Sequence, residues 1–266
     1  MIFVIANIIA AILYAALSVT LTTQVIRQAT PNIGLLLRAI AVTLCFHAVG
    51  IYGISVKAEG IQLSFFAVSS LIFWVINIIV LLSSLRKPLH NIFLFLLPLS
   101  AIAVLAALVS HSQSSIIQLD NKLASHVVLS IIAYSLLSIA TLQALLLAYQ
   151  NRQLKAKAGL HSLRYLPPLQ TMEALLFEFL LVGEILLTLS IITGFIFLEN
   201  IFAQHMAQKT AFSIAAWLVY AFLLIGKYKL GWRGNTAIRW TLSGFLFLML
   251  AYFGSKLVLE MILHRV

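Results

Sequence analysis

An imidazole stands at the head of a mostly polar stripe within one of the long apolar runs of this sequence. Ser130, Tyr134, Leu137 and Thr141 follow His126 at steps of four, four, three and four residues. On one helix, these steps keep all five side chains within a narrow sector. The stripe therefore predicts either a binding site headed by an imidazole or a set of hydroxyl groups that bond to neighbouring helices.

Two further histidines lie in apolar runs. His264 follows Glu260 by one helical turn, a spacing at which a carboxylate can orient an imidazole that binds iron or zinc. The alternative is an exposed histidine at a frayed terminus. His47 lies about two-thirds of the way through the run 33–55. Cys45 is two residues away and so points to another helix face, which argues against a joint cysteine–histidine site.

The spacing of these histidines limits the chemistry that they support. Sites for zinc or copper usually carry histidine and acidic ligands at i, i+4 within one helix, and no membrane histidine pairs with another in this way. Gly-rich phosphate loops and nucleophile–base motifs are not found, so we expect no catalytic residue and no enzyme activity. Two imidazoles on separate helices at similar depth can bind the iron of one porphyrin axially. His126 and His264 meet this condition, and spacing alone leaves haem as one possibility among several.

Other polar residues in the apolar runs are also candidates for function, because polar groups are costly in lipid. Glu184 falls near mid-membrane, with Thr188 one turn later. Its carboxyl group would serve a proton or cation path or pair with a histidine, and the sequence does not choose between these. Ser70, Asn77 and Ser84 repeat every seven residues and predict a helix-packing seam.

The elements that must position these residues are membrane helices. Residues of hydrophobic type make up 62% of the 266 residues and charged residues only 9%. So few charges cannot cover a water-facing surface, which excludes a soluble enzyme or a nucleic-acid-binding protein. The runs are too long and too continuous for barrel strands and predict an all-α bundle, a single transmembrane domain over 1–266. The eight predicted spans are 2–24, 33–55, 63–84, 91–111, 123–149, 171–198, 210–226 and 238–263.

The basic residues predict how these spans are oriented. Twelve of the seventeen Lys and Arg residues fall on the side reached after the first, third, fifth and seventh spans. Cytoplasmic loops carry the excess of basic residues, so this side is expected to be cytoplasmic. Both termini are then expected on the outer, periplasmic side.

Several short segments along the chain occur in an order that can be compared with known families. His126 is followed directly by Val127 and, eight residues on, by Tyr134. The other segments are Cys45-Phe-His47, Pro167-Pro168-Leu169, Lys209-Thr210, Trp217-Leu-Val-Tyr220, Gly231-Trp-Arg-Gly234, Gly244 and Ala251-Tyr-Phe-Gly254. In order and spacing they resemble the cytochrome c assembly family, which includes the CcsA and HemX-like membrane proteins. The resemblance runs over nearly the whole chain.

This resemblance implies haem handled at the outer membrane face by two histidines. One matches His126, and the other follows the final Tyr-Phe-Gly segment, where this chain has His264. A further family histidine matches the neighbourhood of Lys227, so that ligand is missing here. The tryptophan-rich outer segment of CcsA is also missing, since residues 199–205 contain no tryptophan.

We therefore expect a haem-binding protein of the bacterial inner membrane that assists cytochrome c-type biogenesis or haem-protein assembly. His126 would be one axial ligand, and His264 or His47 the second. Its expected partners are the lipid bilayer, haem and a membrane partner in a cytochrome assembly complex. The alternative is an accessory or regulatory membrane subunit, for ion transport or control of haem synthesis, that binds no haem.

Overall fold

The chain folds into two compact, mainly helical units. The structure is a computed structural model that describes residues 2–27, 29, 31–57, 60–62, 64–110, 116–117, 120–156, 166–197 and 204–254. The first unit is built on residues 1–118, and the second on residues 119–160 and 167–265. Whether the chain forms a single domain over 1–266 stays a prediction.

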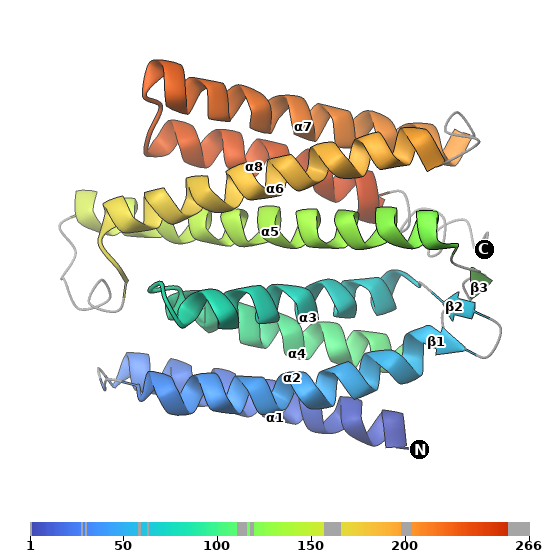
Figure 1. Ribbon diagram of the computed structural model, residues 1–266. Helices are drawn as coiled ribbons and strands as arrows, with labels where there is room; N and C mark the ends of the chain where they lie inside the picture. The colour runs from blue at the N-terminus through green and yellow to red at the C-terminus, as the bar shows by residue number, and fades with distance from the viewer. Residues whose placement is uncertain are drawn as a thin grey trace. The chain divides into compact units, whose positions relative to one another are not determined.

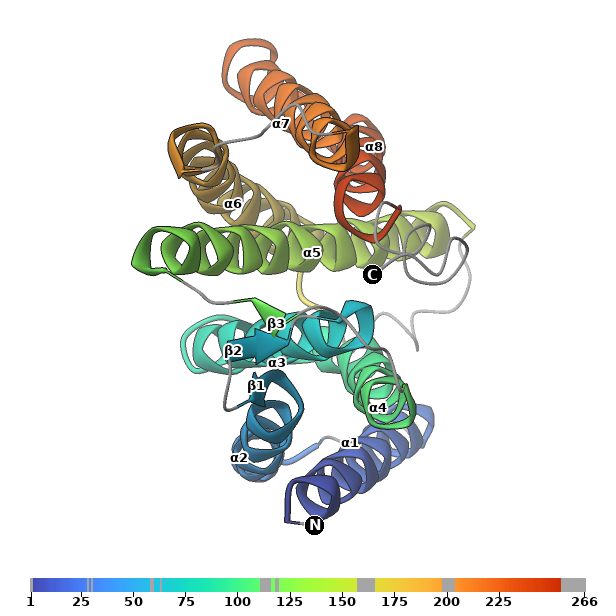
Figure 2. The same cartoon turned by 90° about the vertical axis from the view of Figure 1, so that its right-hand side faces the viewer.

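The first unit is a ring of four helices. Helix α1 packs against α2 and α4, and α3 packs against the same two helices (Figure 2). A short 3₁₀ turn, His90–Ile92, leads into α4. The four helices are α1 (Ile2–Ile26), α2 (Ile33–Ser55), α3 (Phe65–Ser84) and α4 (Phe93–Val109).

Three very short strands join two connections of this first unit. They are β1 (Val56–Lys57), β2 (Gly60–Gln62) and β3 (Ile116–Ile117), paired antiparallel in the order β1-β2-β3. Residue Ile61 stands opposite Val56 on one side and Ile117 on the other. The sequence did not predict these strands, because two or three residues are too few to show an alternating pattern.

The second unit repeats the ring arrangement with the other four helices. Helix α5 packs against α6 and α8, and α7 packs against the same two (Figure 1). Helix α8 continues into a π-helical turn, Leu250–Gly254, which also packs on α7. The four helices are α5 (Asn121–Lys155), α6 (Leu169–Phe197), α7 (Gln204–Leu230) and α8 (Asn235–Met249).

The prediction of an all-α membrane bundle with eight helices is confirmed. Within the described residues, seven helices are long and apolar enough to cross a membrane, and the described part of α8 has 15 residues. Helix α5 is longer than the predicted span 123–149. Its 35 residues extend about 52 Å, against a hydrocarbon core of about 30 Å. The two ends of α5, which lie beyond the apolar run, consist largely of polar and charged residues.

Polar residues hold the interior of the first unit together, while large apolar side chains face outward. The predicted seam on α3 contacts two neighbours, because Ser70 bonds to α2 whereas the Asn77 amide donates to Ser100 Oγ of α4 at 2.7 Å. Outward-facing side chains such as Ile12 and Ile102 are more than half exposed. Apolar side chains also fill much of the interior, so they lie on both the inner and the outer faces of these helices. This distribution suits helices whose outer surface meets lipid.

Candidate functional site

The imidazole of His126 is held by α6 in one tautomer. Its Nδ1 lies 3.0 Å from the backbone oxygen of Ser190 and 3.2 Å from Oγ1 of Thr193. A carbonyl oxygen only accepts hydrogen bonds, so Nδ1 carries the proton and a neutral ring keeps its lone pair on Nε2. No described residue bonds to Nε2. Histidines that bind metals use this arrangement, donating one ring N–H to a carbonyl while the other nitrogen stays free.

The stripe below His126 faces two different neighbours. Ser130 Oγ donates to the His126 carbonyl at 2.7 Å and meets Ser190 Oγ of α6 at 2.7 Å. Tyr134 instead reaches α8, where its hydroxyl donates to the sulfur of Met249 at 2.6 Å. Thr141 bonds within its own helix, to the Leu137 carbonyl. The hydroxyl groups thus bond largely to neighbouring helices or to α5 itself, and the free imidazole nitrogen is the part of the stripe available to a ligand.

Aromatic rings gather around Tyr134 in the second unit. The Tyr134 ring lies 5.9 Å from the ring of Phe245 and 6.2 Å from that of Tyr252, between centroids. Tyr134 lies eight residues, or about 12 Å, along α5 from His126. Flat aromatic side chains suit a porphyrin, whose ring is apolar and whose iron takes axial nitrogen ligands. The free nitrogen of His126 therefore fits an axial position of haem iron, and the rings around Tyr134 fit the apolar surface of a porphyrin.

Glu184 is a buried carboxyl group without a hydrogen-bond partner. Both of its side-chain oxygens, and the hydroxyl of Tyr220, are buried and unbonded within the described part of the chain. One turn along α6, Thr188 accepts a hydrogen bond from the Trp217 indole at 2.8 Å. Unbonded buried polar groups are rare and call for a functional explanation. Neither the proton path nor a pairing with histidine is decided by these contacts.

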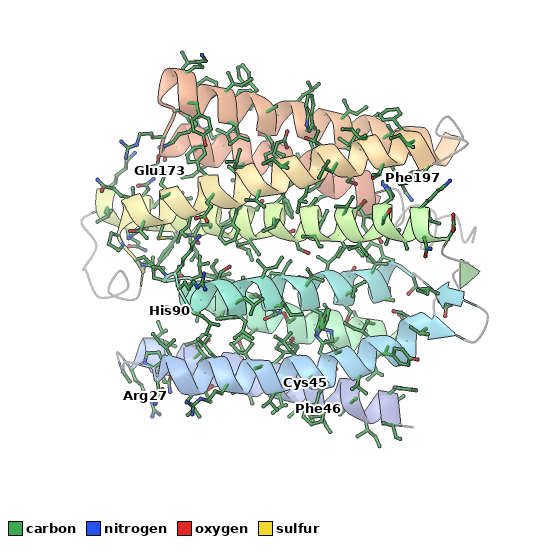
Figure 3. The ribbon with its side chains drawn as sticks, in the orientation of Figure 1. Arg27, Cys45, Phe46, His90, Glu173 and Phe197 are labelled. Atoms are coloured by element: carbon green, nitrogen blue, oxygen red, sulfur yellow. The ribbon has the colours of Figure 1, made fainter. Side chains whose placement is uncertain are left out.

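A cluster of three charged residues near the beginning of α6 was not predicted from the sequence. Glu173 is 4% exposed, and its Oε1 lies 3.3 Å from Lys227 Nζ and 3.3 Å from Arg233 Nε. The ammonium group of Lys227 also lies 4.4 Å from the centroid of the Phe177 ring. Glu173 and Phe197 mark the two ends of α6 in Figure 3. The sequence predicts all three charged residues on the same side of the membrane, and this was the signal that could have indicated the cluster.

His47 has both ring nitrogens engaged within the first unit. Nδ1 lies 3.1 Å from the Tyr14 hydroxyl of α1, and Nε2 lies 2.9 Å from Ser70 Oγ of α3. The side chain is fully buried, whereas Cys45 is exposed on the outer side of α2 (Figure 3). The two residues lie on different faces, as their spacing predicts. His47 thus connects three helices.

The structure places the predicted ligands in different parts of the chain. His126 belongs to the second unit and His47 to the first. His264 lies outside the described residues. The identity of a second axial ligand therefore stays a prediction.

Three relatives are similar to this chain over part of its length. It is 40% identical over 137 residues to the inner membrane protein YpjD of Escherichia coli, a match that covers 52% of each chain. It is 25% identical over 134 residues to protein HemX of Brevibacillus brevis, covering 50% of this chain and 49% of HemX. It is 30% identical over 87 residues to the cytochrome c biogenesis protein CcsA of Prochlorococcus marinus, covering 32% of this chain and 28% of CcsA. The chain thus spans about half the length of YpjD and HemX and less of CcsA.

No solved structure matches this chain. The family described as "Cytochrome C assembly protein" matches residues 35–263, which include most of the first unit and the second unit from its first helix. This range contains His47 and the whole His126 stripe. By this match the chain belongs to the cytochrome C assembly protein family.

Proposed function

We propose that this protein is a haem-binding membrane factor, without catalytic activity of its own, that assists cytochrome c-type biogenesis or haem-protein assembly. The observation that carries the proposal is the His126 tautomer, in which the Ser190 carbonyl takes the Nδ1 proton and leaves Nε2 without a partner among the described residues. Family membership and the aromatic rings around Tyr134 support it. Haem bound there would supply the iron, and the chain would supply its ligand and an apolar wall.

We assign His126 as one axial ligand and favour His264 over His47 as the second. His47 would have to give up its hydrogen bond to Tyr14 or to Ser70 before either nitrogen was free. Breaking such a bond would leave a buried hydroxyl unpaired, at about 1–3 kcal/mol. The family resemblance supports a ligand at the position of His264.

The proposed location is the bacterial inner membrane, with both termini on the periplasmic side. The name of YpjD supports the membrane, and the seven long apolar helices support repeated crossing. The excess of basic residues on one side supports the orientation. A membrane component of a cytochrome assembly complex is the proposed partner.

The experiment is a haem titration of the full chain purified in detergent, followed by absorption spectra of the oxidised and reduced forms. We expect a sharp Soret band at one haem per protein in the wild type and in His90→Ala, the control. His126→Ala should lose most of this band, and added imidazole should restore it, because free imidazole can occupy the position of the missing side chain. Rescue by imidazole separates loss of a ligand from loss of folding.

An unchanged spectrum in His126→Ala would refute the ligand assignment. The absence of stoichiometric haem uptake by the wild type would favour a second function, an accessory or regulatory membrane subunit that binds no haem. The unbonded, buried carboxyl of Glu184 favours that function among the remaining candidates, as a site for a proton or cation. Ion flux in vesicles that carry wild-type protein or Glu184→Gln would then test it, and equal flux would reject it.

A further inference from the structure

A small pocket lined partly by cations lies between the end of α5 and the beginning of α8. It has a volume of about 240 Å³ and is lined by Ala148, Asn151, Arg152, Lys155, Asn235, Ile238 and Arg239. Two side chains are apolar, two are amides and three are cations, with no carboxylate among them. The pocket lies within the second unit.

The three cations of this pocket have no counter-ion within the described residues. Arg152, Lys155 and Arg239 take part in no ion pair there. The contrast with Lys227 and Arg233 is informative, because those two cations of the same unit share the buried carboxylate of Glu173. Three neighbouring like charges repel one another, so a bound anion would stabilise the pocket.

The beginning of α8 adds a second attraction for an anion. Gly234 caps this helix without a side-chain hydrogen bond, and its first turn holds no acidic residue. The first N–H groups of a helix have no partner within it and carry partial positive charge. Arg239 lies just beyond this turn, where a cation opposes the helix dipole unless an anion is present.

The pocket is separate from the haem site proposed above. Residues 126 and 152 lie on the same helix, and a rise of 1.5 Å per residue puts them about 39 Å apart along α5. The cavity is also smaller than the roughly 300–1,000 Å³ typical of pockets for drug-sized molecules. It therefore suits a small anionic group and not a porphyrin.

We infer that this pocket binds the phosphate group of an anionic phospholipid. The cations and amides would hold the phosphate oxygens, while Ala148 and Ile238 would contact the glycerol and the start of the acyl chains. Arginine and asparagine side chains both donate hydrogen bonds that phosphate oxygens accept. Basic pockets between membrane helices are suited to such headgroups. The two apolar lining residues favour a lipid over free phosphate.

The test is native mass spectrometry of the full chain in detergent, titrated with phosphatidylglycerol or with phosphatidylcholine. We expect one tightly held phosphatidylglycerol per protein and weaker retention of phosphatidylcholine. Each cation removed should weaken phosphatidylglycerol binding about fivefold, so Arg152→Gln/Arg239→Gln should weaken it about twenty- to thirtyfold. Lys229→Gln, which removes a cation of α7 outside the pocket, should leave binding unchanged.

Two further arms keep the inference falsifiable. Lys155→Gln changes only an exposed residue in the last turn of α5, so an effect of about fivefold there supports the pocket even if the double variant fails to fold. Equal binding by Lys155→Gln and Lys229→Gln would overturn the inference. Sodium phosphate, compared with sodium chloride at equal ionic strength, should not displace the lipid. Selective displacement by phosphate would overturn the lipid assignment and identify a site for a soluble anion.

Discussion

At the scale of single residues, the hydrogen bonds of two histidines separate a candidate ligand from a structural group. One ring nitrogen of His126 hydrogen-bonds to α6, and the other has no partner among the described residues. Both ring nitrogens of His47 form hydrogen bonds, one with α1 and one with α3. Both histidines lie in apolar helices, and only their neighbours distinguish them. We therefore expect substitutions of the two residues to act on different properties.

His47→Leu is expected to destabilise the first unit. The change removes two interhelical hydrogen bonds and leaves the hydroxyl groups of Tyr14 and Ser70 buried without this partner. We expect a loss of about 2 kcal/mol in the free energy of unfolding. Thermal unfolding of the purified protein in detergent would measure it, with Cys45→Ala, on the exposed face of α2, as the control. An equal unfolding temperature for both variants would contradict the structural role of His47.

Glu184→Leu is expected to raise thermal stability. The carboxyl group is buried with both oxygens unbonded, and an apolar side chain of similar size removes that cost. Glu173→Leu, on the same helix, should have the opposite effect because that carboxylate holds two cations. The unfolding temperature of each variant, compared with that of the wild type, shows whether the substitution raises or lowers stability. A lower unfolding temperature for Glu184→Leu would show that its carboxyl group contributes to folding.

At the scale of elements, the Glu173 cluster ties α6 to the end of α7 and to the turn before α8. Lys227 donates from α7, and Arg233 donates from the short connection between α7 and α8. The carboxylate of Glu173 therefore holds both the end of α7 and the connection that follows it against α6. The two ion pairs differ in exposure, since the Lys227 side chain is 29% exposed and that of Arg233 is 62% exposed.

This difference predicts unequal coupling energies. Solvent screens an exposed ion pair more than a buried one, so Glu173 should couple more strongly to Lys227 than to Arg233. We expect about 1 kcal/mol for the pair with Lys227 and less for the pair with Arg233. Double-mutant cycles of Glu173→Gln with Lys227→Met and with Arg233→Met, read by thermal unfolding, would measure both. The reverse order would show that Arg233 is the main partner.

At the scale of the whole molecule, each unit is a ring of four helices with the same order of neighbours. Successive helices within each unit run in opposite directions, so their connections alternate between the two ends of that unit (Figure 1). Twelve of the seventeen basic residues fall at every second connection, which supports the proposed membrane orientation. The order of helices within each unit therefore agrees with the topology that the charges predict.

The topology predicts which thiols an impermeant reagent can reach. In a Cys45→Ala background, Lys122→Cys should react in intact spheroplasts, because the beginning of α5 is expected on the periplasmic side. Lys229→Cys, at the end of α7, should react only after the membrane is permeabilised. Both positions are exposed in the structure, so burial does not protect either. The reverse pattern of labelling would invert the proposed orientation.

The sequence by itself determined the class of protein, the number of helices and the family. Apolar runs of about 20 residues cannot be hidden in a soluble domain of this size, so composition and run length were sufficient. His126 was found because helical spacing places a stripe on one face without knowledge of the partner helix. Helix ends were less certain, since α5 and α7 extend beyond their apolar runs into polar residues.

Only the tertiary structure decided which polar groups are engaged. The pattern of a single helix does not predict that His126 meets the Ser190 carbonyl, that His47 meets the Tyr14 hydroxyl, or that two cations meet Glu173. These partners lie between 33 and 64 residues away in the sequence. The cationic pocket likewise joins the end of one helix to the beginning of another that comes about 80 residues later. Hydrogen bonds and charges act over a few ångströms, so chemistry that depends on them is fixed only when distant segments pack together.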